Sequence, residues 1–167
     1  MTPNPKSPAE LTEAQRTGRR ARDADQDRTL VAMHQLEAAL AAAAPGRKAP
    51  WRRDVVAALA VLDEATTEEQ ANADRADSLL SDIKRTQPRL RSRVNGVRAQ
   101  YRHLRRTLAS LREELANTDE TDPDIADIRQ RLAWLLMALR HQRARESDLI
   151  YDAYRETFNT DLDHDTP

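Results

Sequence analysis

The 167-residue chain has no cysteine, only three glycines and few aromatic residues. Without cysteine it cannot form a disulfide framework, a zinc ribbon, an iron–sulfur cluster or a thiol nucleophile. The glycines, Gly18, Gly46 and Gly96, are too few and too far apart for a glycine-rich phosphate-binding loop. P-loop and Rossmann nucleotide-binding sites are therefore excluded.

Long apolar segments are also missing. The wholly apolar runs, such as Ala38 to Ala44, are all far below the roughly 20 residues that span a bilayer. The sequence from Met1 to Lys6 lacks the hydrophobic region of a signal peptide. We expect a soluble, cytoplasmic protein that does not associate with membranes.

Helix-forming residues dominate what is present. The chain has 27 alanines and 19 leucines against ten valines and isoleucines, which predicts an all-α protein. Prolines and glycines divide it into four helices, because helix interiors tolerate proline badly. The predicted helices run from about Pro8 to Ala44, from Trp51 to about Lys84, from the Gln87-Pro88 break to Asn117, and from Ile125 to Phe158.

Short connections between long helices place neighbours antiparallel, so we predict an up-down-up-down four-helix bundle with a long first helix. Residues 29–158 would form this bundle. Residues 1–28 would be a charged N-terminal extension, lying on the surface or frayed, because Glu13 to Arg28 is charged nearly all round. Residues 159–167 would be an acidic tail. Thr121-Asp122-Pro123-Asp124 would cap the fourth helix.

The third helix carries the clearest pattern. Its apolar residues are spaced alternately four and three apart and predict one buried seam: Leu90, Val94, Val97, Tyr101, Leu104, Leu108, Leu111 and Leu115. Both tryptophans, Trp51 and Trp134, are expected to anchor the core or the bundle ends, with Leu135-Leu136-Met137 packing around them.

Polar residues interrupt the seams of the other helices. Thr66 and Glu69 fall on the seam of the second helix, and Gln142 and Glu146 fall on that of the fourth. In the first helix, His34 follows Leu30 by one helical turn. Burying such groups costs about 1–3 kcal/mol each unless they find partners, so together they predict a polar pocket inside the bundle. The alternative is that Glu69, His34 and Glu146 tilt to the surface and that Tyr101 packs as core.

A family resemblance adds to this interpretation. The chain resembles the hemerythrin-like family, also called HHE cation-binding domains, especially the actinobacterial type, over roughly Leu30 to Phe158. The resemblance rests on Leu30-Val31-Ala32-Met33-His34, on the Gln87-Pro88-Arg89-Leu90 break followed by Val97-Arg98-Ala99-Gln100-Tyr101, and on Arg140-His141-Gln142-Arg143-Ala144-Arg145-Glu146-Ser147-Asp148-Leu149-Ile150-Tyr151. It implies an antiparallel four-helix bundle that holds a non-heme di-iron centre.

Carried over by position, the resemblance implies six metal ligands, several of them altered. His34 and His141 match the family's first-helix and fourth-helix histidines, and Glu146 matches the acidic residue that follows. The second-helix His-x-x-x-Glu corresponds to Gln70 and Asp74, and the third-helix histidine to Tyr101. An amide is a weak ligand and a phenol ionises only near pH 10, so the resemblance implies a vestigial or altered metal pocket, with di-iron only if the family site survives. The Glu-x-x-His pairing of ferritin-like proteins does not occur in the chain.

Three functions remain open at this point. The first is a non-enzymatic binding or sensing module with an altered pocket. The second is a metal-free helical adaptor that works through a protein partner or self-association, possibly as a dimer. The third is nucleic-acid binding by the arginine-rich third helix. The net charge of −1 and the acidic second helix beside it argue against nucleic acid, because these charges can pair with each other.

Overall fold

The computed structural model describes residues 11–42, 44–117 and 124–164. Within these ranges it contains five α-helices, one short 3₁₀ helix and no strand, so the prediction of an all-α protein is confirmed. The elements are α1 (Glu13–Ala41), α2 (Lys48–Ala73), α3 (Leu79–Thr86), η1 (Pro88–Leu90), α4 (Arg91–Asn117) and α5 (Ile125–His164). None of the described helices is long and apolar enough to cross a membrane.

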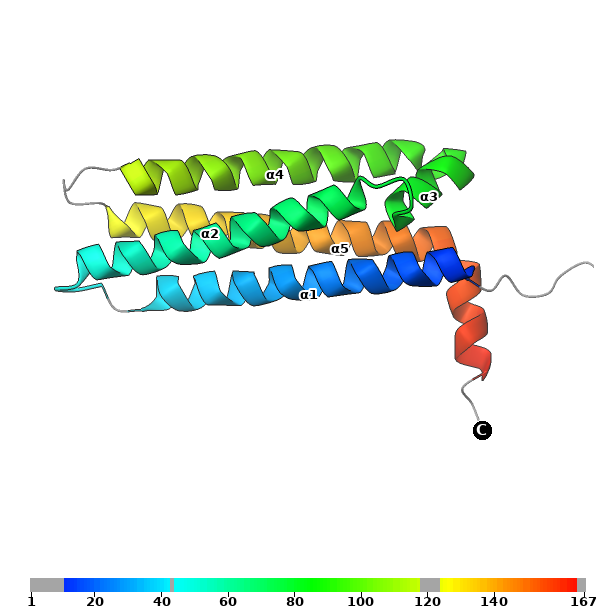
Figure 1. The fold of residues 1–167 in the computed structure, drawn as a ribbon, viewed down its shortest axis with the longest axis horizontal. Coiled ribbons are helices and arrows are strands. Elements are labelled where there is room, and N and C mark those ends of the chain that lie inside the picture. The colour runs from blue at the N-terminus through cyan, green and yellow to red at the C-terminus, as the bar shows by residue number, and fades with distance from the viewer. Residues whose placement is uncertain (1–10, 43, 118–123, 165–167) are drawn as a thin grey trace, which may run out of the picture.

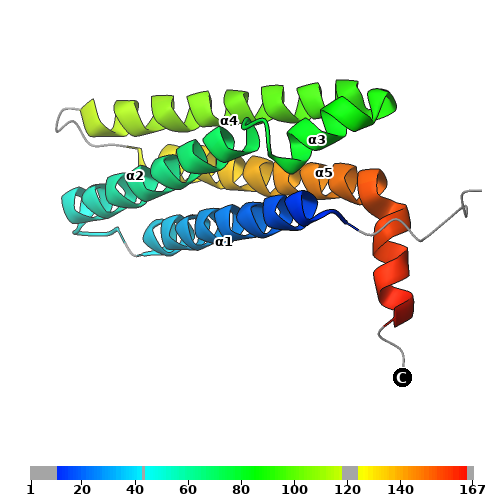
Figure 2. The same ribbon diagram turned by 45° about the vertical axis from the view of Figure 1, so that its right-hand side comes forward.

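The four long helices lie side by side, and each runs opposite to the one before it in the chain (Figures 1 and 2). Contacts join α1 to α2, α2 to α4, α4 to α5, and α1 to α5. The short α3 contacts α1, α4 and α5, so it covers the end of the assembly at which α2 stops.

The second predicted helix is divided in two, which corrects our boundary at Lys84. It ends at Ala73 and begins again at Leu79 as α3. Ser78 caps α3, since its Oγ accepts a hydrogen bond from the Ser81 amide at 3.2 Å, and it donates one to the Ala73 carbonyl at 2.7 Å. A serine that satisfies both new helix ends compensates for the interrupted helix. With no proline or glycine at the break, the sequence pattern did not reveal it.

The first half of α1 is packed helix, which differs from the surface-lying or frayed segment that we expected. Thr12 and Gln15 form a reciprocal capping box, and α1 then runs without a break past residue 28 to Ala41. Gln15 donates from Nε2 to Asp82 of α3 at 3.0 Å, and Leu11 is buried. Three charged residues of this half, Arg22, Asp25 and Arg28, have partners on other helices, and the charge pattern did not reveal these contacts.

Two apolar clusters form the core. One is built mainly on Met33, Leu59, Leu104 and Leu132. It extends from the middle of the four long helices to the end at which the α1–α2 loop lies. The other gathers around α3, from Leu11, Leu79, Leu80, Ile83, Leu90, Val94, Val97, Leu149, Ile150 and Tyr154. Between them lies a set of buried polar residues that we call the polar layer: Thr29, Thr66, Glu69, Gln142 and Glu146.

The predicted seam of the third helix is confirmed, because all eight of its residues are buried. The prediction for Trp134 is wrong. Trp51 is buried beneath the Arg129 guanidinium, which lies 5.3 Å from the ring centroid, whereas Trp134 is 54% exposed and Met137 is 66% exposed. Leu135 and Leu136 occupy the inner face of α5 in their place.

The last helix starts and bends at identifiable residues. Asp124 Oδ1 accepts from the Asp127 amide at 3.1 Å, while the rest of the predicted cap, residues 121–123, lies outside the described residues. Tyr154 has non-helical backbone angles (φ −117°, ψ 17°), and beyond it α5 turns away from the other helices (Figures 1 and 2). Helix therefore continues through residue 164, into the segment expected to be a tail.

Candidate functional site

The polar layer is centred on Glu69 of α2. Its side chain is buried, with the residue only 7% exposed, and its Oε2 accepts a hydrogen bond from the Thr29 hydroxyl of α1. Tyr101 of α4 lies against the same group and donates to the Thr66 carbonyl at 3.5 Å. A carboxyl group is thus held in the interior by side chains from three helices.

Burial governs the protonation of this centre. Removal from water is the largest cause of a raised Glu69 pKa, and the Glu146 carboxylate raises it further, while Thr29, Arg143 and Tyr101 lower it. Burial, followed by the negative charge of Glu69, also raises the pKa of Tyr101. Tyr101 is therefore a neutral phenol at physiological pH, and Glu69 keeps its proton to a higher pH than an exposed glutamate.

Two further carboxylates lie beside Glu69, each with its own cation. Arg22 Nε of α1 donates to Glu146 Oε1 of α5 at 2.8 Å, and Arg22 Nη2 donates to Ser147 at 3.1 Å. Asp25 is buried, pairs with Arg28 and accepts two hydrogen bonds from Asn72 Nδ2 at 3.0 and 3.1 Å. These contacts tie α1 to α2 and α5.

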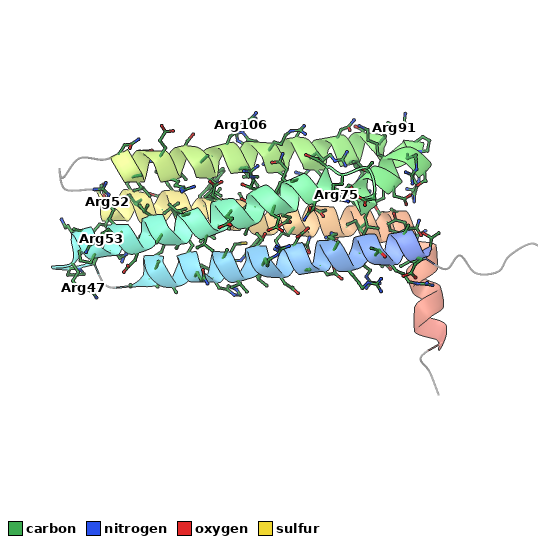
Figure 3. The ribbon with its side chains drawn as sticks, viewed as in Figure 1. Arg47, Arg52, Arg53, Arg75, Arg91 and Arg106 are labelled. Atoms are coloured by element: carbon green, nitrogen blue, oxygen red, sulfur yellow. The ribbon has the colours of Figure 1, made fainter. Side chains whose placement is uncertain are left out.

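A cavity of about 530 Å³ opens beside this cluster, between α1, the end of α2, α3 and α5. Its walls combine small or apolar residues with charged ones, and Arg75 marks its position at the end of α2 in Figure 3. A second space of about 20 Å³ lies between α2, α4 and α5 and shares Glu69, Ala73, Leu80 and Glu146 with the first. The main cavity is lined by Glu13, Ala14, Thr17, Gly18, Ala21, Arg22, Asp25, Glu69, Asn72, Ala73, Arg75, Asp77, Ser78, Leu79, Leu80 and Glu146.

The structure brings four of the six predicted ligands together. Gln70, Asp74, Tyr101 and Glu146 all line the small space behind the main cavity. His34 and His141 are exposed. Each histidine adjoins a buried residue, Met33 in α1 and Gln142 in α5, and one residue of rotation about a helix moves a side chain off the inner face.

These residues do not fit a di-iron centre. Within residues 11–42, 44–117 and 124–164, no three histidine, aspartate or glutamate side chains are grouped so that they could hold a metal ion. Tyr101 keeps its proton, Gln70 offers only a neutral amide, and Asp74 is paired with Arg98 at 3.3 Å. We therefore assign no metal to this site.

Several residues of the site were missed in the sequence. Arg22, Asp25 and Asn72 lie in charged stretches with no apolar period, where each resembles a solvated surface residue. One signal was available: Ala14, Gly18 and Ala21 are small residues spaced four and three apart, on the face of α1 that lines the cavity. Glu69 was predicted to belong to a polar pocket but not to be one of the ligands.

The arginines of α4 are used largely within the molecule. Arg105 and Arg112 pair with Asp63 of α2 at 3.7 and 2.8 Å, in addition to the Arg98–Asp74 pair. This confirms the expected charge pairing between the second and third predicted helices. Arg91 donates from Nε to the Lys84 carbonyl of α3 at 3.4 Å, whereas Arg106 points away from the neighbouring helices (Figure 3).

No protein-family model, curated protein or solved structure matches the chain. The resemblance to hemerythrin-like domains stays a prediction that rests on its short motifs. Functional inference therefore depends on the polar layer and on the cavity beside it.

Proposed function

We propose that this protein is a non-enzymatic binding or sensing module, an antiparallel up-down-up-down four-helix bundle that holds a small molecule in its main cavity. The observation that carries the proposal is that a space of about 530 Å³ adjoins the buried Glu69 carboxyl group. Small-molecule sites are typically clefts of about 300–1,000 Å³ with mostly apolar walls and a few polar groups that orient the ligand.

The way the helices end supports this assignment. Because α2 stops at Ala73 and α3 begins only at Leu79, the cavity wall includes non-helical residues between them, among them Arg75 and Asp77. The polar layer holds its side chains through hydrogen bonds from neighbouring helices, so the groups at the inner end of the cavity are preorganised. The ligand assigned here is organic, because the residues present do not fit the metal that the resemblance implies.

Dye binding tests the proposal. N-phenyl-1-naphthylamine, which fluoresces in apolar surroundings, should bind the protein saturably at one site. Ala21→Leu places a larger side chain in the cavity and should reduce the affinity about ten-fold or more. Ala109→Leu, on an exposed position of α4 that does not line the cavity, is the matched control and should bind as the parent does.

Two results would overturn the proposal: no saturable binding to the parent protein, or unchanged binding by Ala21→Leu. A thermal melt of each variant establishes that it is folded. If Ala21→Leu disturbs folding, Thr17→Leu provides a second blocking variant, since Thr17 lines the same cavity and is exposed.

A specific observation also favours the adaptor as a second candidate. The exposed Trp134 and Met137 lie on α5, and Trp134 borders a surface space of about 700 Å³ between α4 and α5 that His103 and Arg106 also line. Exposed large apolar side chains that lie next to each other mark contact sites more often than isolated ones do. Light scattering should then detect a dimer, and a Trp134→Ala, Met137→Ser double variant should make it monomeric.

A further inference from the structure

We propose that the ligand of the main cavity is a monovalent organic cation, an amine or ammonium group on an apolar body, with its charge placed against Glu69. This inference deepens the proposed function and rests on it. Three features of the cavity support it: the charges that line it, the one carboxyl group that forms no ion pair, and the character of the wall.

The cavity wall is acidic. Five carboxylates line it, from Glu13, Asp25, Glu69, Asp77 and Glu146, against only two guanidinium groups, from Arg22 and Arg75. A cleft lined by one sign of charge concentrates ligands of the opposite sign. Four of the five carboxylates are paired with arginines, so the charge left to repel an anionic ligand and attract a cation is that of Glu69.

Glu69 differs from the other four carboxylates. Glu13 pairs with Arg16, Asp25 with Arg28, Asp77 with Arg75, and Glu146 with Arg22. Glu69 accepts a hydrogen bond from Thr29, and the charge of Arg143 lowers its pKa, but it forms no ion pair with any residue that the structure describes. Its charge is also costly to maintain, because Glu69 is only 7% exposed and has no paired cation in the described part of the chain to offset the loss of water. Buried carboxylates are ordinarily paired, so a bound cation would supply the partner that the fold does not.

The position of Glu69 fits this role. It lines both the main cavity and the small space behind it, so it stands where the two meet, at the side facing α4. The Thr29 hydroxyl holds its Oε2, which fixes the carboxyl group without neutralising it. A charge-assisted hydrogen bond from an ammonium group to a carboxylate is roughly twice as strong as a neutral one.

The remainder of the wall suits an apolar body of moderate size. Ala14, Ala21 and Ala73 are small, and Leu79 and Leu80 supply apolar surface opposite them. At Gly18 a β-carbon would lie 3.5 Å from Leu79, so α1 and α3 approach closely there. Arg22 and Arg75 occupy the same wall, and their positive charges would oppose a second cationic group on the ligand. The ligand is therefore monovalent and not a polyamine.

Three probes that share one ring system test the inference. Binding of 1-naphthylmethylamine, 1-naphthylmethanol and 1-naphthoate is measured by calorimetry on the full chain at pH 7.5. The amine should bind about ten-fold more tightly than the alcohol, and the naphthoate more weakly than both. Glu69→Gln should lower the affinity for the amine about ten-fold and keep the affinity for the alcohol within about two-fold of that of the parent protein.

Glu68→Gln is the matched control. Glu68 is the neighbouring residue on α2, is exposed, pairs with Arg28 at 2.7 Å and does not line the cavity. It should change neither affinity. If Glu69→Gln does not fold, the ratio of amine to alcohol affinity in the parent protein still decides the question.

The outcomes separate the two proposals. Equal binding of amine and alcohol, or tighter binding of naphthoate, overturns the cation inference and leaves a neutral small-molecule site standing. An amine preference that survives Glu69→Gln overturns the role of Glu69. Failure of all three probes to bind overturns this inference together with the proposed function.

Discussion

Arg22 and Glu146 form an ion pair between α1 and α5, with Arg22 Nε 2.8 Å from Glu146 Oε1. Their side chains are 18% and 11% exposed, so the pair is largely shielded from water. Arg22→Met should lower the free energy of unfolding by about 2–3 kcal/mol, because it leaves a buried carboxylate without its cation beside Glu69. Urea denaturation at pH 7 measures the change.

An exposed ion pair on the same helix is the control. Arg20 reaches Glu13 at 3.4 Å with side chains 69% and 74% exposed, so Arg20→Ala should cost less than about 1 kcal/mol. The double variant Arg22→Met, Glu146→Met should recover part of the loss, since an apolar pair can replace a buried ion pair. Equal losses in the free energy of unfolding for Arg22→Met and Arg20→Ala would show that the shielded pair stabilises the protein no more than an exposed pair does.

Glu69→Gln should stabilise the free protein at neutral pH. The pKa of Glu69 is raised, first by burial and then by Glu146, so the folded state binds its proton more tightly than the unfolded state does. For such an acid, stability falls as pH rises from the unfolded pKa through the folded one. Glutamine is neutral at every pH, so the variant avoids this loss and should gain about 1 kcal/mol at pH 8.

The gain should disappear toward pH 4, where Glu69 is protonated in both states. Denaturation of the parent and the variant at pH 4, 6 and 8 tests this dependence, with Glu68→Gln as the exposed comparison. Thr29, Tyr101, Arg143 and Glu146 face Glu69 and are unchanged in both variants. If the stability difference between Glu69→Gln and the parent stays constant across this pH range, the penalty does not come from the buried charge of Glu69 and the prediction is wrong.

The fold was predictable where burial follows a simple period. Leu104, Leu108 and Leu111 lie on a 3.6-residue repeat, and hydrophobic burial alone selects the face that they share. The break between α2 and α3 was not predictable in this way. It depends on Ser78 hydrogen bonds to the Ala73 carbonyl and the Ser81 amide, and the seam continues across it through Leu80 and Ile83.

The site was predictable only in part. Seam spacing correctly placed Glu69, Gln142 and Glu146 inside, because helix phase determines which residues face inward. The same spacing was wrong for His34, one turn after Leu30, which lies outside, and so does His141, which motif similarity alone had suggested. The cavity lies between α1, α5 and the junction of α2 and α3, a tertiary relationship that no local pattern encodes.

Gln142→Leu should have little effect on stability or should increase it. Gln142 is 2% exposed and donates from Nε2 to the Val97 carbonyl at 2.8 Å, but its Oε1 has no hydrogen-bond partner. An unpartnered buried acceptor costs about 1–3 kcal/mol, which offsets the one bond lost in the variant. Gln142→Ala, which leaves a void, should instead cost about 2–3 kcal/mol. Thermal unfolding distinguishes the two variants, and a loss for leucine as large as that for alanine would contradict the prediction.

The bend in α5 should depend on Gln87, the residue between α3 and η1. At Tyr154 the backbone angles leave the helical range, and side chains from another part of the chain reach carbonyls of the preceding turn. Gln87 Nε2 donates to the Ala153 carbonyl at 2.6 Å, and Arg89 Nη2 donates to that of Asp152 at 3.3 Å. Gln87→Ala leaves a part-buried carbonyl without this donor and should cost about 1–2 kcal/mol.

Hydrogen exchange locates this effect in the chain. Amides of residues 154–164 should exchange faster in Gln87→Ala, while those of the α4 seam should lose protection only by the global change in stability. Thr86→Ala is a suitable control, because Thr86 is exposed and its hydroxyl bonds only within α3, to the Asp82 carbonyl at 2.8 Å. If both variants alter exchange beyond Tyr154 equally, the bend is held by the packing of Tyr154 and its 2.7 Å hydrogen bond to Asp82, and not by Gln87.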